Sequence, residues 1–311
     1  MQKAKIMKIN KYSIQLFVFI GLLLAGTGCE DYLNKPLEDE AIVEQTDYTK
    51  TENMSSPLIG LYAELYSIGW EKLPLLSIRG YDVNKGAQGD QQVLGDVDKF
   101  IYDENFWMLR LTWQWFYQGV FLANSTIEEI EKYKKFADNK TKADQYIAEA
   151  KVIRAWYLFH LARAWGRIFI DESPDPSGLF EAELKDKAVV MEYIDEQMEE
   201  AVPDLPDRHP NQREDIPGGV TRHTALAIQA QANLELENYQ GVADATSQII
   251  SSGLFRLYPD FYQLFKLEGK LNNENLLELQ YSDFGSGSGE QRRHLYAFYG
   301  PQNWTPAVQG A

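Results

Sequence analysis

The sequence predicts an all-α protein, a tetratricopeptide-like scaffold of helical hairpins with long irregular loops. Three observations lead to this prediction. They are a long helical stretch that is apolar on nearly every side, an aromatic-rich segment of helical spacing before it, and an Ala-rich helix pair further along. With 311 residues, the chain is long enough to bury a large core.

The long helical stretch runs from Ala143 to Gly166 and contains no Pro, and no Gly before its last residue. Thr141 is the expected N-cap, with Asp144 three residues later as in a capping box, and Gly166 is the expected end. From Val152 onward, apolar side chains occupy nearly every side of this helix. Because such a helix must be covered all round, we expect the other elements to surround it.

The first 28 residues are typical of a lipoprotein signal peptide. Four lysines precede an apolar run that is short for a membrane span, and small residues then lead to Cys29. Cys29 is the only cysteine, so we expect no disulfide within the chain and a lipid on this residue at the mature terminus. An ordinary cleaved signal and an uncleaved anchor are the alternatives. Removing the four lysines would take the net charge from −16 to −20, which disfavours nucleic acid as a partner.

The segments before the long helix follow in order. Residues 29–50 are acidic and poor in apolar side chains, which predicts a tether. Helical spacing covers residues 53–66, and the polar, Gly-rich residues 81–100 predict a long loop. Residues 104–136 return to helical spacing, with Gly119 as an expected break or kink. Only a short turn separates them from the long helix, so the two helices should be antiparallel neighbours.

After the long helix, residues 187–202 predict a shorter helix, and residues 203–219 are a linker rich in Pro and Gly. Residues 224–237 are Ala-rich on one side and are followed, after a short turn, by helical spacing over 242–251. Small residues on one helix allow close packing of the other, as in a tetratricopeptide hairpin. Residues 275–281 alternate like a strand.

Catalytic chemistry has little support in the sequence. The four histidines are scattered without metal-ligand spacing, and there is no nucleophile elbow or phosphate-binding loop. We therefore predict no catalytic residue, no metal and no cofactor. The acidic residues between 82 and 98 lack the ligand order of an EF-hand. Carboxylates are so numerous that a glycan hydrolase stays as an alternative.

Five passages, in order, resemble the SusD/RagB family of outer-membrane lipoproteins from Bacteroidetes. They are Cys29 with the Glu-Asp-Tyr-Leu that follows it, and residues 113–124, 148–166, 220–227 and 273–280. The resemblance spans nearly the whole chain and is most specific in residues 148–166. In that family a C-terminal region packs on the helical one. We therefore expect a SusD-like helical domain over residues 51–311, without the C-terminal continuation of the family.

The resemblance implies a function in nutrient capture. It implies a protein lipid-anchored in the outer membrane and facing the cell exterior, which binds a glycan or oligosaccharide. A SusC-like TonB-dependent transporter would be the partner that receives this ligand, with no bond made or broken. A peptide-binding RagB-like protein and a tetratricopeptide-type interaction scaffold are the alternatives.

The resemblance also implies ligand-binding residues on two segments that supply aromatic and polar side chains, a combination that suits the faces and hydroxyls of sugars. For Tyr296 and Trp304, packing against other parts of the protein is the alternative. The implied residues are Arg79, Tyr81, Asp82, Lys85, Gln88, Asp90, Tyr296 and Trp304.

Overall fold

The computed structural model describes residues 41–43, 46–66, 77–80 and 92–280. The chain divides into two compact units, Met1–Thr49 and Lys50–Ala311. In the first unit, β1 (Ile42–Val43) and β2 (Thr46–Asp47) form an antiparallel pair in which Ile42 lies opposite Asp47.

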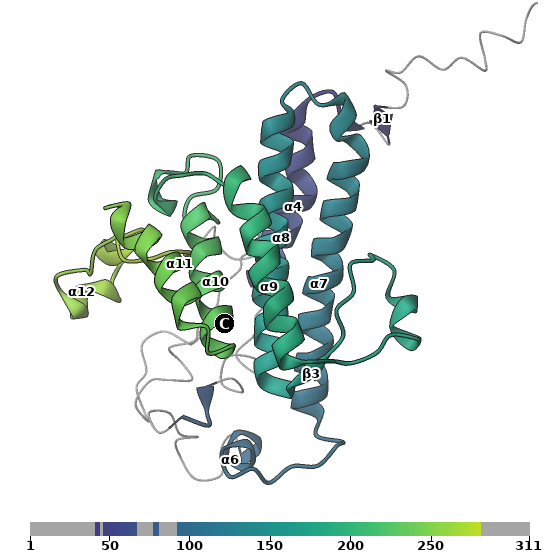
Figure 1. Cartoon of the computed structure of the whole chain (residues 1–311), viewed down its shortest axis with the longest axis vertical. Helices are drawn as coiled ribbons and strands as arrows, with labels where there is room; N and C mark the ends of the chain where they lie inside the picture. The colour runs from purple at the N-terminus through teal and green to yellow at the C-terminus, as the bar shows by residue number, and fades with distance from the viewer. Residues whose placement is uncertain (1–40, 44–45, 67–76, 81–91, 281–311) are drawn as a thin grey trace, which may run out of the picture. The chain divides into compact units, whose positions relative to one another are not determined.

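The second unit is built from helices (Figure 1). This confirms the predicted all-α class and the tetratricopeptide-like pairing of helices. The α-helices among its described residues are α4 (Ser55–Tyr66), α6 (Gln92–Asp98), α7 (Trp107–Tyr133), α8 (Lys140–Trp165), α9 (Lys187–Ala201), α10 (Arg222–Glu235), α11 (Tyr239–Ser251) and α12 (Phe261–Leu264).

Short 3-10 helices and one strand pair connect these helices. The strands β3 (Arg167–Ile168) and β4 (Lys185–Asp186) pair in antiparallel fashion between α8 and α9. The 3-10 helices are η1 (Thr51–Met54), η2 (Lys134–Phe136), η3 (Pro176–Phe180), η4 (Val202–Asp204), η5 (Pro210–Gln212) and η6 (Leu267–Gly269).

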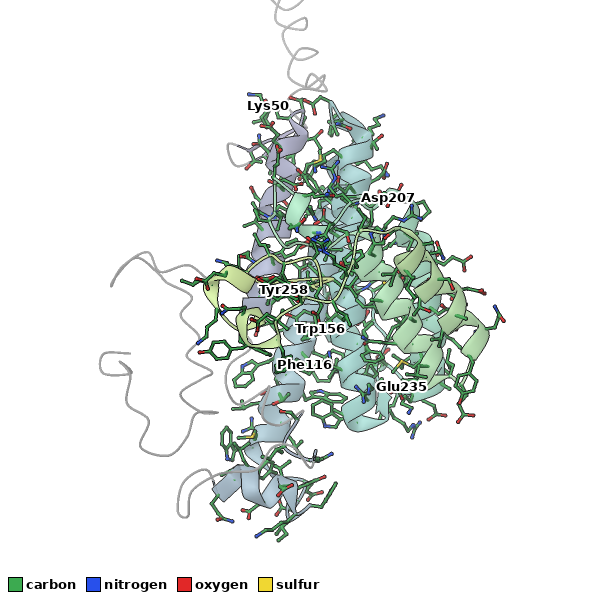
Figure 2. All side chains as sticks on the ribbon, turned by 90° about the vertical axis from the view of Figure 1, so that its left-hand side faces the viewer. Lys50, Phe116, Trp156, Asp207, Glu235 and Tyr258 are labelled. Atoms are coloured by element: carbon green, nitrogen blue, oxygen red, sulfur yellow. The ribbon has the colours of Figure 1, made fainter. Side chains whose placement is uncertain are left out.

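Helix α8 is the centre of the second unit, as predicted. It packs against α4, α7, α9 and α10 (Figure 1). From Val152 to Ala162 every side chain is buried or half-buried. The rings of Phe116 on α7 and Trp156 on α8 meet edge to face with centroids 6.1 Å apart (Figure 2). Because the helix is apolar all round, the neighbouring helices bury it on all sides.

The start of α8 differs from the prediction, whereas its end agrees. The side chain of Asn139 accepts a hydrogen bond from the Lys142 N–H at 3.0 Å, so Asn139 is the N-cap and Thr141 lies in the first turn. Asn139 caps the helix instead of Thr141 because its side-chain carbonyl reaches the N–H of the third helical residue, Lys142. Gly166 ends the helix with a φ of +78°, a conformation that costs Gly little.

Gly119 does not break α7, which corrects that part of the prediction. The helix is continuous from Trp107 to Tyr133, and Gly119 faces the ring of Tyr157 on α8. A Cβ at position 119 would lie 2.3 Å from Cζ of Tyr157. The missing side chain of Gly119 therefore leaves the space that the Tyr157 ring of α8 occupies against α7.

Two other predictions of local structure are wrong. Helix α6 occupies part of the predicted loop 81–100, because Leu94 and Val97 are buried at helical spacing. Within the described residues from 275 to 280 no strand forms. Instead a single backbone hydrogen bond joins the Glu278 N–H to the Gly218 carbonyl at 2.9 Å.

The predicted hairpin is formed by α10 and α11, which pack together through Leu226, Ala230 and Ala245. Thr224 and Thr221 exchange capping contacts at the start of α10. No helix among the residues that the structure describes is long and apolar enough to cross a membrane.

A buried ion pair joins α8 to the segment before α10. Nη1 of Arg213 lies 2.8 Å from Oε2 of Glu149, and the two side chains are 1% and 0% exposed. The Tyr62 hydroxyl of α4 donates to the same Oε2 at 2.6 Å and accepts the Val220 N–H at 2.9 Å. Burial, followed by the charge of Glu149, raises the pKa of Tyr62 well above its usual range, so this hydroxyl keeps its proton. Three segments thus meet at one carboxylate.

We predict that Gly119→Ala destabilises the protein although Ala favours helix. The added methyl would overlap the Tyr157 ring, and overpacking of this kind costs about 1–3 kcal/mol in urea unfolding. Gly60→Ala on α4 is the matched control, because a Cβ at Gly60 meets nothing within 4 Å. It should gain up to about 1 kcal/mol from helix propensity. Equal effects of the two substitutions would contradict the packing role of Gly119.

We further predict that Arg213→Met lowers the free energy of unfolding by about 3–5 kcal/mol, because it leaves the Glu149 carboxylate buried without its cation. Adding Glu149→Gln removes the stranded charge while keeping an acceptor for Tyr62, so the double variant should recover much of the loss. Thermal and urea denaturation measure both. A double variant no more stable than Arg213→Met would show that the charge is not the cause.

Candidate functional site

Exposed aromatic side chains gather beside Arg79, between α6 and α7. Phe100 is 64% exposed and Tyr102 is 37% exposed, and Ile101 between them is also exposed. We call Arg79, Phe100 and Tyr102 the Arg79 cluster.

A small core fixes the backbone under this cluster. Ile78, Leu94, Val97 and Met108 are buried together. They come from the turn that carries Arg79, from α6 and from the start of α7. The backbone on either side of the cluster is therefore anchored, while the cluster's own side chains stay at the surface.

The end of α6 directs the aromatic residues outward. The Ile101 N–H donates to the Asp96 carbonyl at 2.7 Å and the Phe100 N–H to the Val97 carbonyl at 3.0 Å. This is the Schellman pattern, in which the residue after the C-cap takes the left-handed conformation that favours glycine. Phe100 occupies that position with a φ of +59°. A side chain there costs roughly 1 kcal/mol relative to Gly.

Arg79 contacts both aromatic rings. Its guanidinium carbon lies 5.0 Å from the centroid of the Phe100 ring and 5.3 Å from that of Tyr102. Nη2 of Arg79 also donates to the Tyr102 hydroxyl at 2.6 Å. Tyr102 is supported from behind by Phe106, with ring centroids 5.9 Å apart. Cation–π contacts at exposed sites contribute about 0.5–1 kcal/mol each, so Arg79 restrains both rings.

The Arg79 cluster offers apolar ring faces next to hydrogen-bond donors. That combination suits a ligand with C–H faces and hydroxyl edges, and it contains no pair of groups arranged for acid–base or nucleophilic chemistry. Phe100 gains little from burial, so the strain at its backbone has no counterpart in core packing. Because backbone strain often persists where it serves binding, the strained and exposed Phe100 is a candidate ligand-binding residue.

Only one of the sequence-predicted ligand residues, Arg79, belongs to the part of the chain that the structure describes. The structure brings it together with Phe100 and Tyr102, which the sequence analysis missed. The helical spacing of Leu94 and Val97, followed by an aromatic pair, was the available signal. The predicted residues outside the described ones are Cys29, Tyr81, Asp82, Lys85, Gln88, Asp90, Tyr296 and Trp304.

Metal binding has no candidate among the described residues. No group of three or more His, Cys, Asp or Glu side chains lies there in positions to share an ion. His160 packs against Trp156 with ring centroids 4.4 Å apart, and burial, with a smaller effect of Arg163, lowers its pKa to about 4. A neutral, ring-packed imidazole is a core residue in this setting.

Comparison with known proteins places this architecture among SusD-like proteins. The model of a family described as starch-binding and associating with the outer membrane matches residues 81–234. A SusD-like protein from Formosa agariphila is 21% identical over 94% of this chain and 57% of its own length. A SusD-like protein from Bacteroides ovatus is 24% identical over 87% of this chain and 50% of its own length. The chain thus spans about half the length of these relatives.

Solved structures show the same fold. A SusD-like protein from Bacteroides fragilis matches with a TM-score of 0.66 and 18% identity, over 81% of this chain and 48% of that one. The surface glycan-binding protein A from Bacteroides thetaiotaomicron, in complex with laminarihexaose, matches with a TM-score of 0.62 and 21% identity, over 75% and 50%.

Proposed function

This chain belongs to the SusD/RagB family, and from that premise we propose that it is a cell-surface protein that binds a glycan without cleaving it. The observation that carries the proposal is the Arg79 cluster. It holds two exposed aromatic rings around a guanidinium at the cost of a strained residue. Selective affinity requires such a surface and needs no catalytic group.

Laminarin is the first ligand to test. Two solved proteins of this fold are a laminarin-binding SusD-like protein and a glycan-binding protein in complex with laminarihexaose. Tyr81, Asp82, Lys85, Gln88 and Asp90 follow Arg79 closely in the chain, so we propose that they complete the site from that side. We propose the same role for Tyr296 and Trp304.

We propose that the bound glycan passes to a SusC-like TonB-dependent transporter of the outer membrane. In this proposal residues 1–28 are a lipoprotein signal peptide, residues 29–50 a tether and residues 51–311 the SusD-like helical domain. A lipid on Cys29 would hold the domain at the outer face of the membrane. Family membership supports the partner and the location.

Phe100→Gly should separate binding from stability. Glycine takes the left-handed conformation at little cost, so the free energy of unfolding should stay unchanged or rise by at most about 1 kcal/mol. Loss of the ring should weaken retardation in affinity gels containing laminarin at least about tenfold. Glu237→Gly is the matched control, since Glu237 is exposed and has a φ of +58° in the α10–α11 turn.

Three outcomes would contradict the proposal. They are retention of Phe100→Gly equal to that of the unsubstituted protein, an equal loss for Glu237→Gly, and release of reducing sugar by the purified protein. If no polysaccharide in a panel retards the protein, the peptide-binding or scaffold alternative replaces the glycan proposal.

Cys29→Ser tests the anchor. Cells fed labelled palmitate should transfer label to the unsubstituted protein and to a Cys29-containing Phe100→Gly variant, and none to Cys29→Ser. Because Cys29 is the only cysteine, label on the Cys29→Ser variant would contradict the proposal that Cys29 carries the lipid.

A further inference from the structure

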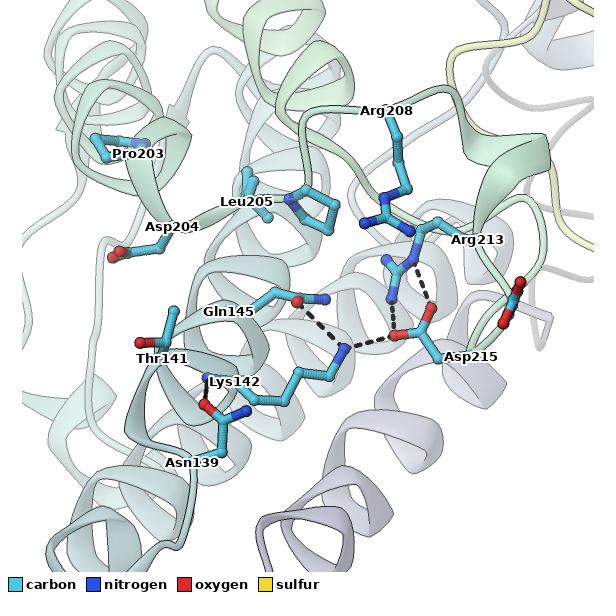
Figure 3. A pocket seen from close by; sticks show the side chains of 12 residues that line it. Asn139, Thr141, Lys142, Gln145, Pro203, Asp204, Leu205, Arg208, Arg213 and Asp215 are labelled. Carbon is cyan, nitrogen blue, oxygen red and sulfur yellow. Dashed lines mark hydrogen bonds and ion pairs between the residues drawn. The ribbon is translucent and has the colours of Figure 1, made fainter.

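Apart from the Arg79 cluster, a pocket lies between the first turns of α8 and the segment that links α9 to α10 (Figure 3). Its volume is ≈ 550 Å³. This is within the usual range for small-ligand sites. The N-cap residue Asn139 lines it together with Thr141 and Lys142 of α8. Arg208, Arg213 and Asp215 line it from the linking segment.

The charged floor of this pocket is held rigidly. Arg213 donates from Nε and Nη2 to the two carboxylate oxygens of Asp215 at 3.0 and 2.9 Å, and it is anchored from behind by Glu149. Lys142 Nζ lies 2.7 Å from Asp215 and 3.2 Å from Gln145 Oε1 (Figure 3). Although burial opposes ionisation, hydrogen bonds from Arg213 and Lys142 hold the pKa of Asp215 below its usual range. Asp215 is therefore neutralised by two cations.

Donors without an acceptor in the described part of the chain surround this floor. Arg208 is exposed and forms no ion pair or side-chain hydrogen bond there, and its guanidinium extends into the pocket toward Arg213 (Figure 3). Asn139 uses its carbonyl oxygen to cap α8, which leaves its amide N–H groups free. The Thr141 hydroxyl also lines the pocket. The Lys142 ammonium donates to Asp215 and Gln145 and also lies 5.0 Å from the centroid of the Tyr146 ring, so its contacts are made within the fold.

The remaining lining sets the shape and the balance of charge. Pro203, Leu205 and Pro206 form an apolar wall opposite the α8 donors. Asp204 lies at the rim with its carboxylate turned away from Arg208 (Figure 3). The exposed carboxylate of Glu214 also lines the pocket, so three acidic and three basic side chains share it. Lys142 and Arg213 are paired with Asp215, whereas Arg208 forms no ion pair among the described residues.

We propose that this pocket binds the carboxylate of a uronic acid residue in a glycan. A guanidinium binds the two oxygens of a carboxylate with matched geometry, and Arg208 is placed to do so. The Asn139 amide and the Thr141 hydroxyl suit ring hydroxyls, and the proline wall suits the apolar face of a sugar. That the carboxylate belongs to a sugar rests on the proposed function, whereas the carboxylate itself is assigned from the pocket.

The acidic character of the whole chain, with a net charge of −16, opposes an anionic ligand. Beyond a Debye length of about 8 Å at physiological salt, however, exposed acids are largely screened. Asp204 and Glu214 line the pocket itself and oppose an anion there, so the preference depends on direct contact between the ligand carboxylate and the guanidinium of Arg208. Binding should be specific to the position of the carboxylate and only moderately sensitive to salt.

Titration of the full chain with glucuronate and with glucose, followed by ligand-observed NMR, tests the proposal. Glucuronate should bind at least about tenfold more tightly than glucose. Arg208→Gln should abolish this preference without changing thermal stability, because Arg208 has no partner in the described fold. Asn139→Asp keeps the cap of α8 but replaces the amide donor with a negative charge, so it should lose the preference as well. Arg256→Gln, at an exposed arginine elsewhere, should behave as the unsubstituted protein.

The proposal is overturned if glucuronate and glucose bind equally, if Arg208→Gln keeps the preference, or if Arg256→Gln loses it to the same extent. Phe100→Gly is expected to retain glucuronate binding. If the unsubstituted protein binds glucuronate but not laminarin, the proposal for the Arg79 cluster has failed. If it binds laminarin without preferring glucuronate to glucose, the proposal for this pocket has failed.

Discussion

The second unit depends on one carboxylate, that of Glu149, which lies inside the protein on the helix that everything else surrounds. Moving an ionised group out of water is costly unless charge and hydrogen bonds compensate it. Arg213 and Tyr62 supply that compensation, and each belongs to a different segment. Tyr62 also binds the backbone at Val220, immediately before α10. The helix hairpin of α10 and α11 is therefore joined to α4 and α8 through polar contacts with strict geometry, in addition to apolar packing.

The two candidate sites lie at opposite ends of α8. Asn139 caps its N-terminus beside the pocket, whereas Trp165 at its C-terminus contacts Trp113 near the start of α7, with ring centroids 5.3 Å apart. With 26 residues, α8 is about 39 Å long at 1.5 Å per residue. A glycan chain would have to be extended to contact both ends at once. Separate sites on a rigid helix would allow a long glycan to be held at two points, which raises the effective concentration at the second.

Arg79, Phe100 and Arg208 share a physical property that separates them from the core. Phe100 is a ring on a strained backbone, and Arg79 and Arg208 are cations that form no ion pair with any residue that the structure describes. Natural proteins tend to keep such local conflicts where a ligand relieves them. The buried network around Glu149 is the opposite case, because its charges are matched within the fold.

The sequence by itself determined α4, α7, α8, α9, α10 and α11, their order and the apolar character of the central helix, because periodicity and end signals such as Gly166 act within a few residues. The sequence also contains the five passages that resemble the SusD/RagB family. Only the tertiary structure decided that Gly119 is a helix contact rather than a break, since that depends on the ring of Tyr157 from another helix. The same holds for α6, whose Leu94 and Val97 are recognised as core only once Ile78 and Met108 cover them. Likewise, the meeting of Arg79 with Phe100, and of Glu149 with Arg213, follows from contacts between distant segments, which local spacing does not encode.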